Sequence, residues 1–327
     1  MKDILFLAVC FSFLLADSVQ AVEFPPLTPE EREGTHTAGV TSASFSPDGK
    51  KVVTTSLDCT ARIWDTESGK ELKVLSGHFH VWDIESEEKL QKLDENANEG
   101  VVVAFSPDGE KIVTANGGDY AKIWDAESGK ELHKLEGHTN HVRSVAFSPD
   151  GKKVVTAGSD GTARIWDAES GKELQKVVVP TKEGHYPYIY CAAFSPDGKK
   201  IVTGSYDNIA RIWDAETGKE LKKFAGHADY VMSAAFSPDG KKIATAGYND
   251  YTARIWDVES GKELRTLWGH KSSVQSVVFS PDGKKIVTAS SDSTARIWDV
   301  ESGKELHTLG RVDRQTLYYS EMDKKHQ

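Results

Sequence analysis

The sequence predicts an all-β protein built from repeated units of four short antiparallel strands. The chain has 327 residues, and two motifs recur along it in a common register. Phe-Ser-Pro-Asp-Gly begins at positions 45, 105, 147, 194, 236 and 279, and Trp-Asp begins at positions 64, 82, 124, 166, 213, 256 and 298. Self-similarity at a period of about 20–50 residues is typical of repeat architectures, so the chain is an array of similar units.

One complete unit, residues 137–177, shows why each repeat should form four strands. The runs VRSVAF, KKVVTAG, TARIWD and KELQKV alternate or are rich in β-branched residues, and turn residues separate them. In the turn Ser-Pro-Asp-Gly, the proline sets its own φ and the later glycine can adopt a positive φ. Four strands at a period of about 42 residues describe one blade of a β-propeller.

The first 21 residues carry the pattern of an export signal rather than that of the repeats. Lys2 precedes an apolar run, residues 4–16, and Val19-Gln20-Ala21 suits cleavage after Ala21. The run is shorter than the roughly 20 residues that a membrane-spanning helix needs. We therefore expect a signal peptide at residues 1–21, export of the protein (secreted or periplasmic), and no membrane span after cleavage. Residues 22–34 follow as a proline-rich lead-in.

Seven Trp-Asp pairs in register with Gly-His and Ser-Pro-Asp-Gly resemble the WD-repeat (WD40) β-propeller family. The resemblance covers residues 35–309, and residues 310–327 form a polar tail. It implies four strands per blade in the order a, b, c, d, with strand a lining a central channel. The a–b and c–d turns then lie on one face, and the b–c and d–a loops lie on the other. We call the second face the variable face, because its loops differ between the repeats of this chain.

One unit of the array is truncated. His78 is followed by Trp82 after four residues, whereas the histidine of the other Gly-His pairs precedes Trp by 28 or 29, so 24 residues are missing. Residues 79–93 supply only strands c and d, and a two-stranded hairpin is marginal on its own. Either six complete blades close a ring without this unit, or it occupies a seventh position. We favour the second, six complete blades plus a truncated two-stranded seventh, and expect residues 79–100 to be less ordered than any complete blade.

The family resemblance also implies a hydrogen-bonded tetrad of Trp, Thr, His and Asp in each blade. An indole only donates, a hydroxyl donates and accepts, and an imidazole accepts on one nitrogen while donating from the other. Such a repeated network holds the strands of each blade together, and its hydroxyl does not act as a catalytic nucleophile. Five units carry all four members: His36, Thr54, Asp58 and Trp64; His138, Thr156, Asp160 and Trp166; His185, Thr203, Asp207 and Trp213; His227, Thr245, Asp250 and Trp256; His270, Thr288, Asp292 and Trp298.

The unit that ends at Trp124 departs from this pattern. Asn96 replaces the histidine, and Gly118 stands where the aspartate is expected. We expect the tetrad hydrogen bonds to be least complete in this complete blade.

Other chemistry is not supported by the residue pattern. Histidines outside the tetrads lack metal-ligand spacing, and every glycine-rich stretch is a repeating turn rather than a phosphate loop. The formal net charge of −10 argues against nucleic acid or an anionic membrane as the main partner. Cys59 and Cys191 fall on distant blades, so we expect two unpaired thiols. We therefore expect no cofactor, no metal, no catalytic residue and a monomeric, non-enzymatic protein.

Aromatic side chains set the variable face apart. Eight of the ten tyrosines lie on or beside it: Tyr120, Tyr186, Tyr188, Tyr190, Tyr206, Tyr230, Tyr248 and Tyr251. Clustered Tyr, Arg and Met is typical of interaction hot spots. The residues predicted to bind a partner are Tyr188, Tyr190, Tyr206, Tyr230, Met232, Tyr248, Arg143 and His141. The long loop at residues 179–190 favours this interpretation, whereas tyrosine also suits strand ends, so the residues could simply cap blades.

The sequence thus predicts an exported, non-enzymatic scaffold that binds a protein or peptide through its variable face. Two alternatives stay open. The near-copied repeats and the truncated unit suit a degenerate structural paralogue without a specific partner. An enzyme that uses the channel mouth would need a cluster of non-repeating His, Asp or Glu there, and the sequence contains no sign of one.

Overall fold

A computed structural model describes residues 36–46, 48–58, 60–76, 102–115, 118–180 and 188–310. The predicted signal peptide, the lead-in, the truncated unit at 79–93 and the C-terminal tail lie outside these residues. So do Cys59, Tyr186 and His185. The predictions made for those parts, including lower order at 79–100 and the pairing state of the two cysteines, stay predictions.

The described chain forms six four-stranded antiparallel sheets, each in the order of its strands along the sequence. This confirms the predicted all-β fold with six complete blades. The strands of the first three sheets are β1 (Val40–Phe45), β2 (Lys51–Ser56), β3 (Thr60–Asp65), β4 (Glu71–Ser76); β5 (Val102–Phe105), β6 (Lys111–Ala115), β7 (Tyr120–Asp125), β8 (Glu131–Glu136); β9 (Val142–Phe147), β10 (Lys153–Gly158), β11 (Thr162–Asp167) and β12 (Glu173–Val178).

The remaining three sheets repeat the same spacing. Their strands are β13 (Ile189–Phe194), β14 (Lys200–Ser205), β15 (Ile209–Asp214), β16 (Glu220–Ala225); β17 (Val231–Phe236), β18 (Lys242–Gly247), β19 (Ala253–Asp257), β20 (Glu263–Leu267); β21 (Val274–Phe279), β22 (Lys285–Ser290), β23 (Ala295–Asp299) and β24 (Glu305–Leu309). Strand β24 follows β23 along the chain and pairs with it as the outer strand of the last sheet.

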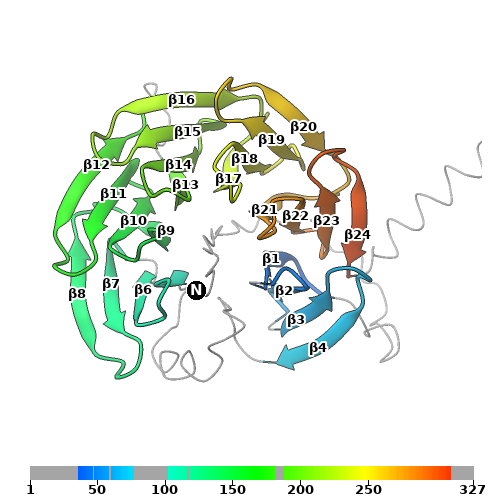
Figure 1. Ribbon diagram of the computed structural model, residues 1–327, viewed down its shortest axis with the longest axis horizontal. Coiled ribbons are helices and arrows are strands. Elements are labelled where there is room, and N and C mark those ends of the chain that lie inside the picture. The colour runs from blue at the N-terminus through cyan, green and yellow to red at the C-terminus, as the bar shows by residue number, and fades with distance from the viewer. Residues whose placement is uncertain are drawn as a thin grey trace, which may run out of the picture.

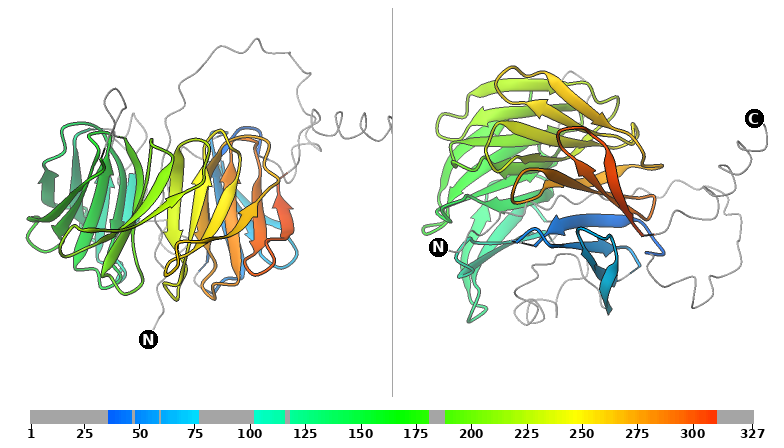
Figure 2. Two further views of the ribbon diagram at one scale, coloured as in Figure 1. Left: turned by 90° about the horizontal axis from the view of Figure 1, so that it is seen from above. Right: turned by 45° about the vertical axis from the view of Figure 1, so that its right-hand side comes forward.

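The six sheets follow one another around a central axis, with the first strand of each sheet innermost and the fourth at the perimeter (Figure 1). Seen from the side, the strands run between two opposite faces of a disc (Figure 2). The core lies between neighbouring sheets, where the strand-c tryptophan packs against the sheet before it. Trp166, for example, shares a hydrophobic cluster with Val113 and Ile123 of the preceding sheet. Burial of such large aromatic surfaces holds the blades together.

The interval between the first and second sheets differs from the other five. The described residues of β1–β4 and β5–β8 share no hydrophobic cluster, although each other neighbouring pair does. Trp124 clusters only with its own sheet and is partly exposed, whereas Trp64, Trp166 and Trp298 are each 2% exposed. The sheets β13–β16 and β17–β20 lie on the opposite side of the ring from this interval (Figure 1).

The Ser-Pro-Asp-Gly turn is explained by its hydrogen bonds. In the turn between β9 and β10, the Gly151 N–H donates to the Ser148 carbonyl at 2.9 Å, and Gly151 has a φ of 70°. The Ser148 hydroxyl donates to the Asp150 carboxylate at 2.6 Å. A positive φ is readily accessible only to glycine, so the motif recurs wherever this turn is needed. No helix among the described residues is long and apolar enough to cross a membrane.

Candidate binding face

The tetrads are present as continuous chains of hydrogen bonds inside the sheets. In the sheet β9–β12, the Trp166 indole donates to the Thr156 hydroxyl at 2.9 Å, and that hydroxyl lies 2.7 Å from His138 Nε2. His138 Nδ1 lies 3.0 Å from the Asp160 carboxylate. With Nδ1 protonated, every polar atom in the chain has a partner. The Asp160 carboxylate also accepts from the Thr139 N–H, which ties the d–a loop to the b–c turn.

Three more sheets contain the same chain. The Trp-to-Thr distances are 2.8 Å at Trp64, 2.8 Å at Trp256 and 2.9 Å at Trp298, and the Thr-to-His distance is 2.7 Å in each. Burial acts to raise the pKa of the Asp292 carboxyl, but His270 and the Thr294 hydroxyl together lower that pKa to about 2. The carboxylate therefore stays ionised and holds its histidine in place.

Two sheets differ. In β13–β16, Trp213 donates to Thr203 at 2.9 Å, but Asp207 forms an ion pair with Arg211 at 2.5 Å. His185, the predicted fourth member, lies outside the described residues. In β5–β8, Trp124 donates to Thr114 at 2.8 Å, and the described part of this sheet contains no histidine or aspartate joined to them.

In the Gly-His pairs that the structure describes, the glycine (Gly137, Gly226 and Gly269) has a packing role that sequence reasoning did not identify. A Cβ atom on Gly137 would lie 2.5 Å from the Arg164 guanidinium and 3.2 Å from the Trp166 ring. Arg164 in turn forms an ion pair with Glu173 of strand d at 2.5 Å. The glycine lets the chain pass directly over the tryptophan and arginine, and its recurrence before five histidines of the sequence was the available signal.

Five tyrosines form a continuous row on the variable face, and we call Tyr188, Tyr190, Tyr206, Tyr230 and Tyr248 the tyrosine row. The Tyr206 and Tyr230 rings stack with centroids 4.1 Å apart, and Tyr230 stacks on Tyr190 at 5.9 Å and on Tyr248 at 5.8 Å. Tyr188 meets Tyr206 and Tyr190 edge to face, at 5.8 Å and 6.4 Å. The row thus crosses from sheet β13–β16 to sheet β17–β20.

The row combines one buried ring with four that are partly exposed. Tyr190 is 8% exposed, while Tyr188, Tyr206, Tyr230 and Tyr248 are half-buried. Burial raises the pKa of Tyr190 to about 12, and burial with a hydrogen bond to Tyr206 also raises the pKa of Tyr230. Tyr190 and Tyr230 therefore remain neutral phenols at neutral pH.

Arg143, from the preceding sheet, lies at one end of the row. Its guanidinium carbon lies 5.2 Å from the centre of the Tyr188 ring and 5.4 Å from that of Tyr190. Its Nε donates to the hydroxyl of Ser159, which is 3% exposed, at 2.5 Å. Three neighbouring sheets thus contribute to one surface.

Some residues predicted to bind a partner are placed differently. The Met232 side chain is 2% exposed, so the prediction that it projects from the variable face is wrong. It belongs to β17, which is the innermost strand of its sheet (Figure 1). His141 is exposed, directly before β9 and Arg143. Tyr120 lies apart from the row, with Lys134 Nζ 4.2 Å from its ring centre.

An exposed tryptophan was missed by sequence reasoning. Trp268 is 69% exposed and follows β20, and Tyr251, which precedes β19, is 41% exposed. The pairing of Ala253 with Leu267 brings these two strand ends together on the outer part of the variable face. Eight tryptophans are present and seven stand in Trp-Asp pairs, so the eighth, Trp268, was the available signal.

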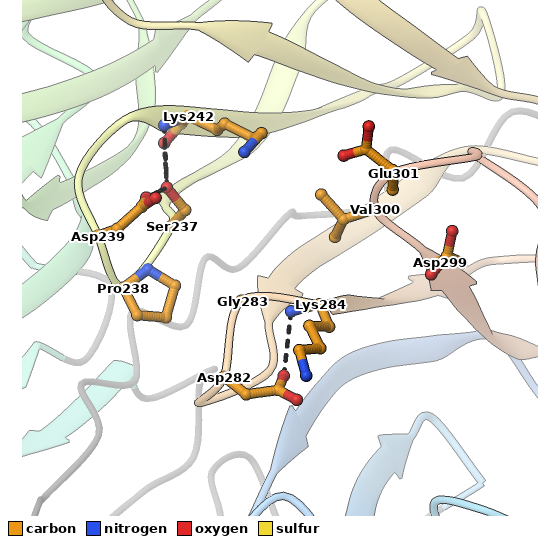
Figure 3. A pocket seen from close by; sticks show the side chains of 10 residues that line it. All are labelled: Ser237, Pro238, Asp239, Lys242, Asp282, Gly283, Lys284, Asp299, Val300 and Glu301. Atoms are coloured by element: carbon orange, nitrogen blue, oxygen red, sulfur yellow. Dashed lines mark hydrogen bonds between the residues drawn. The ribbon is translucent and has the colours of Figure 1, made fainter.

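The opposite face contains a cavity of about 630 Å³ between the last two sheets (Figure 3). Its walls are the repeated turns at residues 237–242 and 282–284 and the turn at 299–301. The carboxylates of Asp239 and Asp282 accept hydrogen bonds from the Ser237 and Ser280 hydroxyls of their own turns. These groups are therefore occupied in turn formation. No cluster of three or more His, Cys, Asp or Glu that could hold a metal occurs among the described residues.

Comparison with known proteins agrees with this architecture. The family described as "WD domain, G-beta repeat" matches residues 31–65, 87–125, 129–167, 176–214, 218–257 and 261–299, and Trp82 lies in none of these segments. The dynein assembly factor with WD repeat domains 1 of Xenopus laevis is 41% identical over 46 residues, which cover 14% of this chain and 11% of that protein. WD40 domains are typically non-enzymatic scaffolds and commonly bind protein partners. With six matched repeats that span most of its length, the chain belongs to the WD40 repeat family.

Proposed function

We propose that the protein is a non-enzymatic WD40 scaffold that binds a protein or peptide partner through the tyrosine row. The observation that supports this most strongly is the continuity of the row across two sheets. Stacked rings offer a large apolar area and lose little side-chain rotational entropy on binding, and each phenol adds a polar hydroxyl. Such a surface is suited to a hot spot, in which a few residues supply most of the binding energy.

Comparison of equivalent positions favours binding over blade capping. The residue directly after strand b is Tyr206 in β13–β16 and Tyr248 in β17–β20, but it is Ser159 in β9–β12 and Ser291 in β21–β24. Sheets with serine at this position form the same four strands. Tyrosine is therefore not required to end strand b, and its concentration in two neighbouring sheets supports a role beyond the fold.

Alanine substitution of Tyr188, Tyr206 and Tyr230 together tests the binding face. Truncating an aromatic hot-spot residue costs about 2 kcal/mol or more of binding free energy. We therefore expect the triple variant to capture its partner from a native extract at least tenfold less efficiently, as measured by quantitative mass spectrometry.

Tyr120→Ala is the matched control, because Tyr120 lies apart from the row in another sheet. Both variants should melt cooperatively. Equal capture by wild type, control and triple variant would reject the binding face and favour the degenerate structural paralogue.

We also propose that the protein is exported. The support is the apolar run at residues 4–16, preceded by Lys2 and followed by Val19-Gln20-Ala21. Expressed in full, the chain should be recovered outside the cytosol with an N-terminus at Val22, as read by N-terminal peptide mass. Replacing Leu14 and Leu15 by arginine should retain it inside, because a charged run is a poor signal. Recovery of an intact Met1 N-terminus from the cytosol would reject export.

A further inference from the structure

We propose that Arg143 is the carboxylate-binding residue of the tyrosine row, so that the partner is an acidic peptide segment with an Asp or Glu side chain at this end of the row. The inference rests on the proposed function of the row and specifies the chemistry of its partner. The carboxylate would meet the guanidinium, and the neighbouring peptide side chains would lie on the exposed tyrosine rings.

The arginines of the described chain differ in how their charges are balanced. Five pair with a carboxylate of their own sheet: Arg62, Arg164, Arg211, Arg254 and Arg296. Arg265 donates to the Glu301 carbonyl oxygen. Arg143 alone among these described arginines has neither a carboxylate nor a carbonyl acceptor. A half-buried cation has lost part of its hydration, and no described carboxylate makes up for this loss. A ligand carboxylate would do so by forming an ion pair with the guanidinium.

The Arg143 side chain is held ready for such a ligand. Its Nε is engaged by the buried Ser159 hydroxyl, and the rings of Tyr188 and Tyr190 lie against the guanidinium. Both terminal nitrogens lack an acceptor among the described residues, and neither belongs to the buried, unsatisfied atoms. The free edge of the guanidinium is therefore open to solvent and can donate two parallel hydrogen bonds. Because the side chain is already ordered, little entropy is lost on binding.

Burial also affects the pKa of the Arg143 guanidinium. It lowers the pKa of the guanidinium, while the Tyr190 and Tyr188 hydroxyls act to raise it. An arginine stays protonated even so, since its ordinary pKa exceeds about 12. The site therefore keeps its positive charge at neutral pH.

The surrounding charges favour a carboxylate over a phosphate. Among the residues that the structure describes, Arg143 is the one cation shown in contact with the rings of the tyrosine row, and it balances a single negative charge. Asp229 adds a negative charge that is felt at both Tyr190 and Tyr230. A phosphoryl group carries about −1.5 to −2 charges at neutral pH and is usually held by several cations or backbone N–H groups. A monoanion fits this balance better.

Another sheet of the same chain has an uncharged residue at the position of Arg143. Gln275 occupies the position of Arg143 in sheet β21–β24, and its side-chain amide donates to Ser291 Oγ at 2.8 Å, as Arg143 does to Ser159. Arg143→Gln should therefore keep the local hydrogen bond and the fold while removing the charge. Lys199→Gln removes one charge from a turn on the opposite face and serves as the matched control.

The experiment selects peptides from a phage-displayed library of random 12-residue sequences on the full-length protein. Those that fail to bind the triple alanine variant of the tyrosine row are kept. Their dissociation constants are then measured by calorimetry on wild type, Arg143→Gln and Lys199→Gln, each with the peptide and with its Glu→Gln or Asp→Asn form. Sodium acetate and inorganic phosphate are tested as competitors.

We expect the retained peptides to be enriched in Asp or Glu. Arg143→Gln should weaken their binding about tenfold, the peptide amide form should weaken it equally, and the two changes should not add. Lys199→Gln should have no effect. Retained peptides that bind Arg143→Gln as tightly as wild type would overturn the carboxylate site and leave the proposed function standing. Phosphate that competes at a tenfold lower concentration than acetate would also overturn it, in favour of a phosphoryl ligand. If no selected peptide depends on the tyrosines, both proposals fall.

Discussion

Replacing Thr156 by valine should lower the free energy of unfolding by about 2–3 kcal/mol. The Thr156 hydroxyl accepts from Trp166 and contacts His138, and all three side chains are at most 4% exposed. Valine keeps the volume but leaves a buried indole N–H and an imidazole nitrogen without partners, and each unsatisfied group costs about 1–3 kcal/mol. Chemical denaturation followed by tryptophan fluorescence measures the change, because the buried tryptophans, Trp166 among them, become exposed on unfolding.

Thr114→Val provides the comparison within the same chain. Thr114 accepts from Trp124, and Trp124 is partly exposed, so water can replace the lost acceptor. We expect this variant to lose about 1 kcal/mol or less. Equal losses for the two variants would mean that the histidine and aspartate members of the tetrad contribute nothing beyond the tryptophan contact.

Among substitutions that add a single methyl group, Gly247→Ala should destabilise the protein most, lowering the free energy of unfolding by about 3 kcal/mol. A Cβ atom there would lie 2.0 Å from the Asp250 carboxylate and 2.5 Å from His227 Nδ1. These two groups form a 2.6 Å hydrogen bond, which must break or move to admit the methyl group. The b–c turn of this sheet has one more residue than the others, and Asp250 consequently reaches back over Gly247.

Gly158→Ala tests that explanation, because Gly158 ends strand b in the sheet β9–β12. Its Cβ would approach His138 Nδ1 no closer than 2.9 Å, and Ser290 occupies the same position in β21–β24. We expect a loss of about 1 kcal/mol, measured by the shift in the denaturation midpoint. A smaller loss for Gly247→Ala than for Gly158→Ala would contradict the steric argument.

The same variant connects stability with the binding face. Tyr248 follows Gly247 directly and forms the end of the tyrosine row, stacked on Tyr230. Displacing the b–c turn therefore moves one ring of the row, so Gly247→Ala should weaken partner capture even at temperatures at which it is folded.

Several features followed from the sequence alone because they depend on short, repeated intervals. The a–b hairpin turn is set by local chemistry, with Pro for its φ and Gly for a positive φ, and the c–d turn also has Gly at a positive φ, so the strand bounds of the complete repeats were predictable. The tetrad contacts join positions at nearly constant separations inside one sheet. Thr156 and Trp166 are ten residues apart, as are Thr288 and Trp298. A register that holds for one sheet therefore holds for the next.

Contacts between sheets were decided by the tertiary structure. Tyr190 stacks on Tyr230, and Arg143 meets Tyr188, across the boundary between neighbouring blades. Such contacts depend on the rotation and spacing of the blades around the axis, which no local motif specifies. The burial of Met232 and the exposure of Trp268 have the same origin, since Met232 belongs to the innermost strand of its sheet, β17, and Trp268 follows the outermost strand, β20. The sequence by itself determined the blades, their turns and their hydrogen-bonded tetrads. Packing between blades decided which side chains form a common surface.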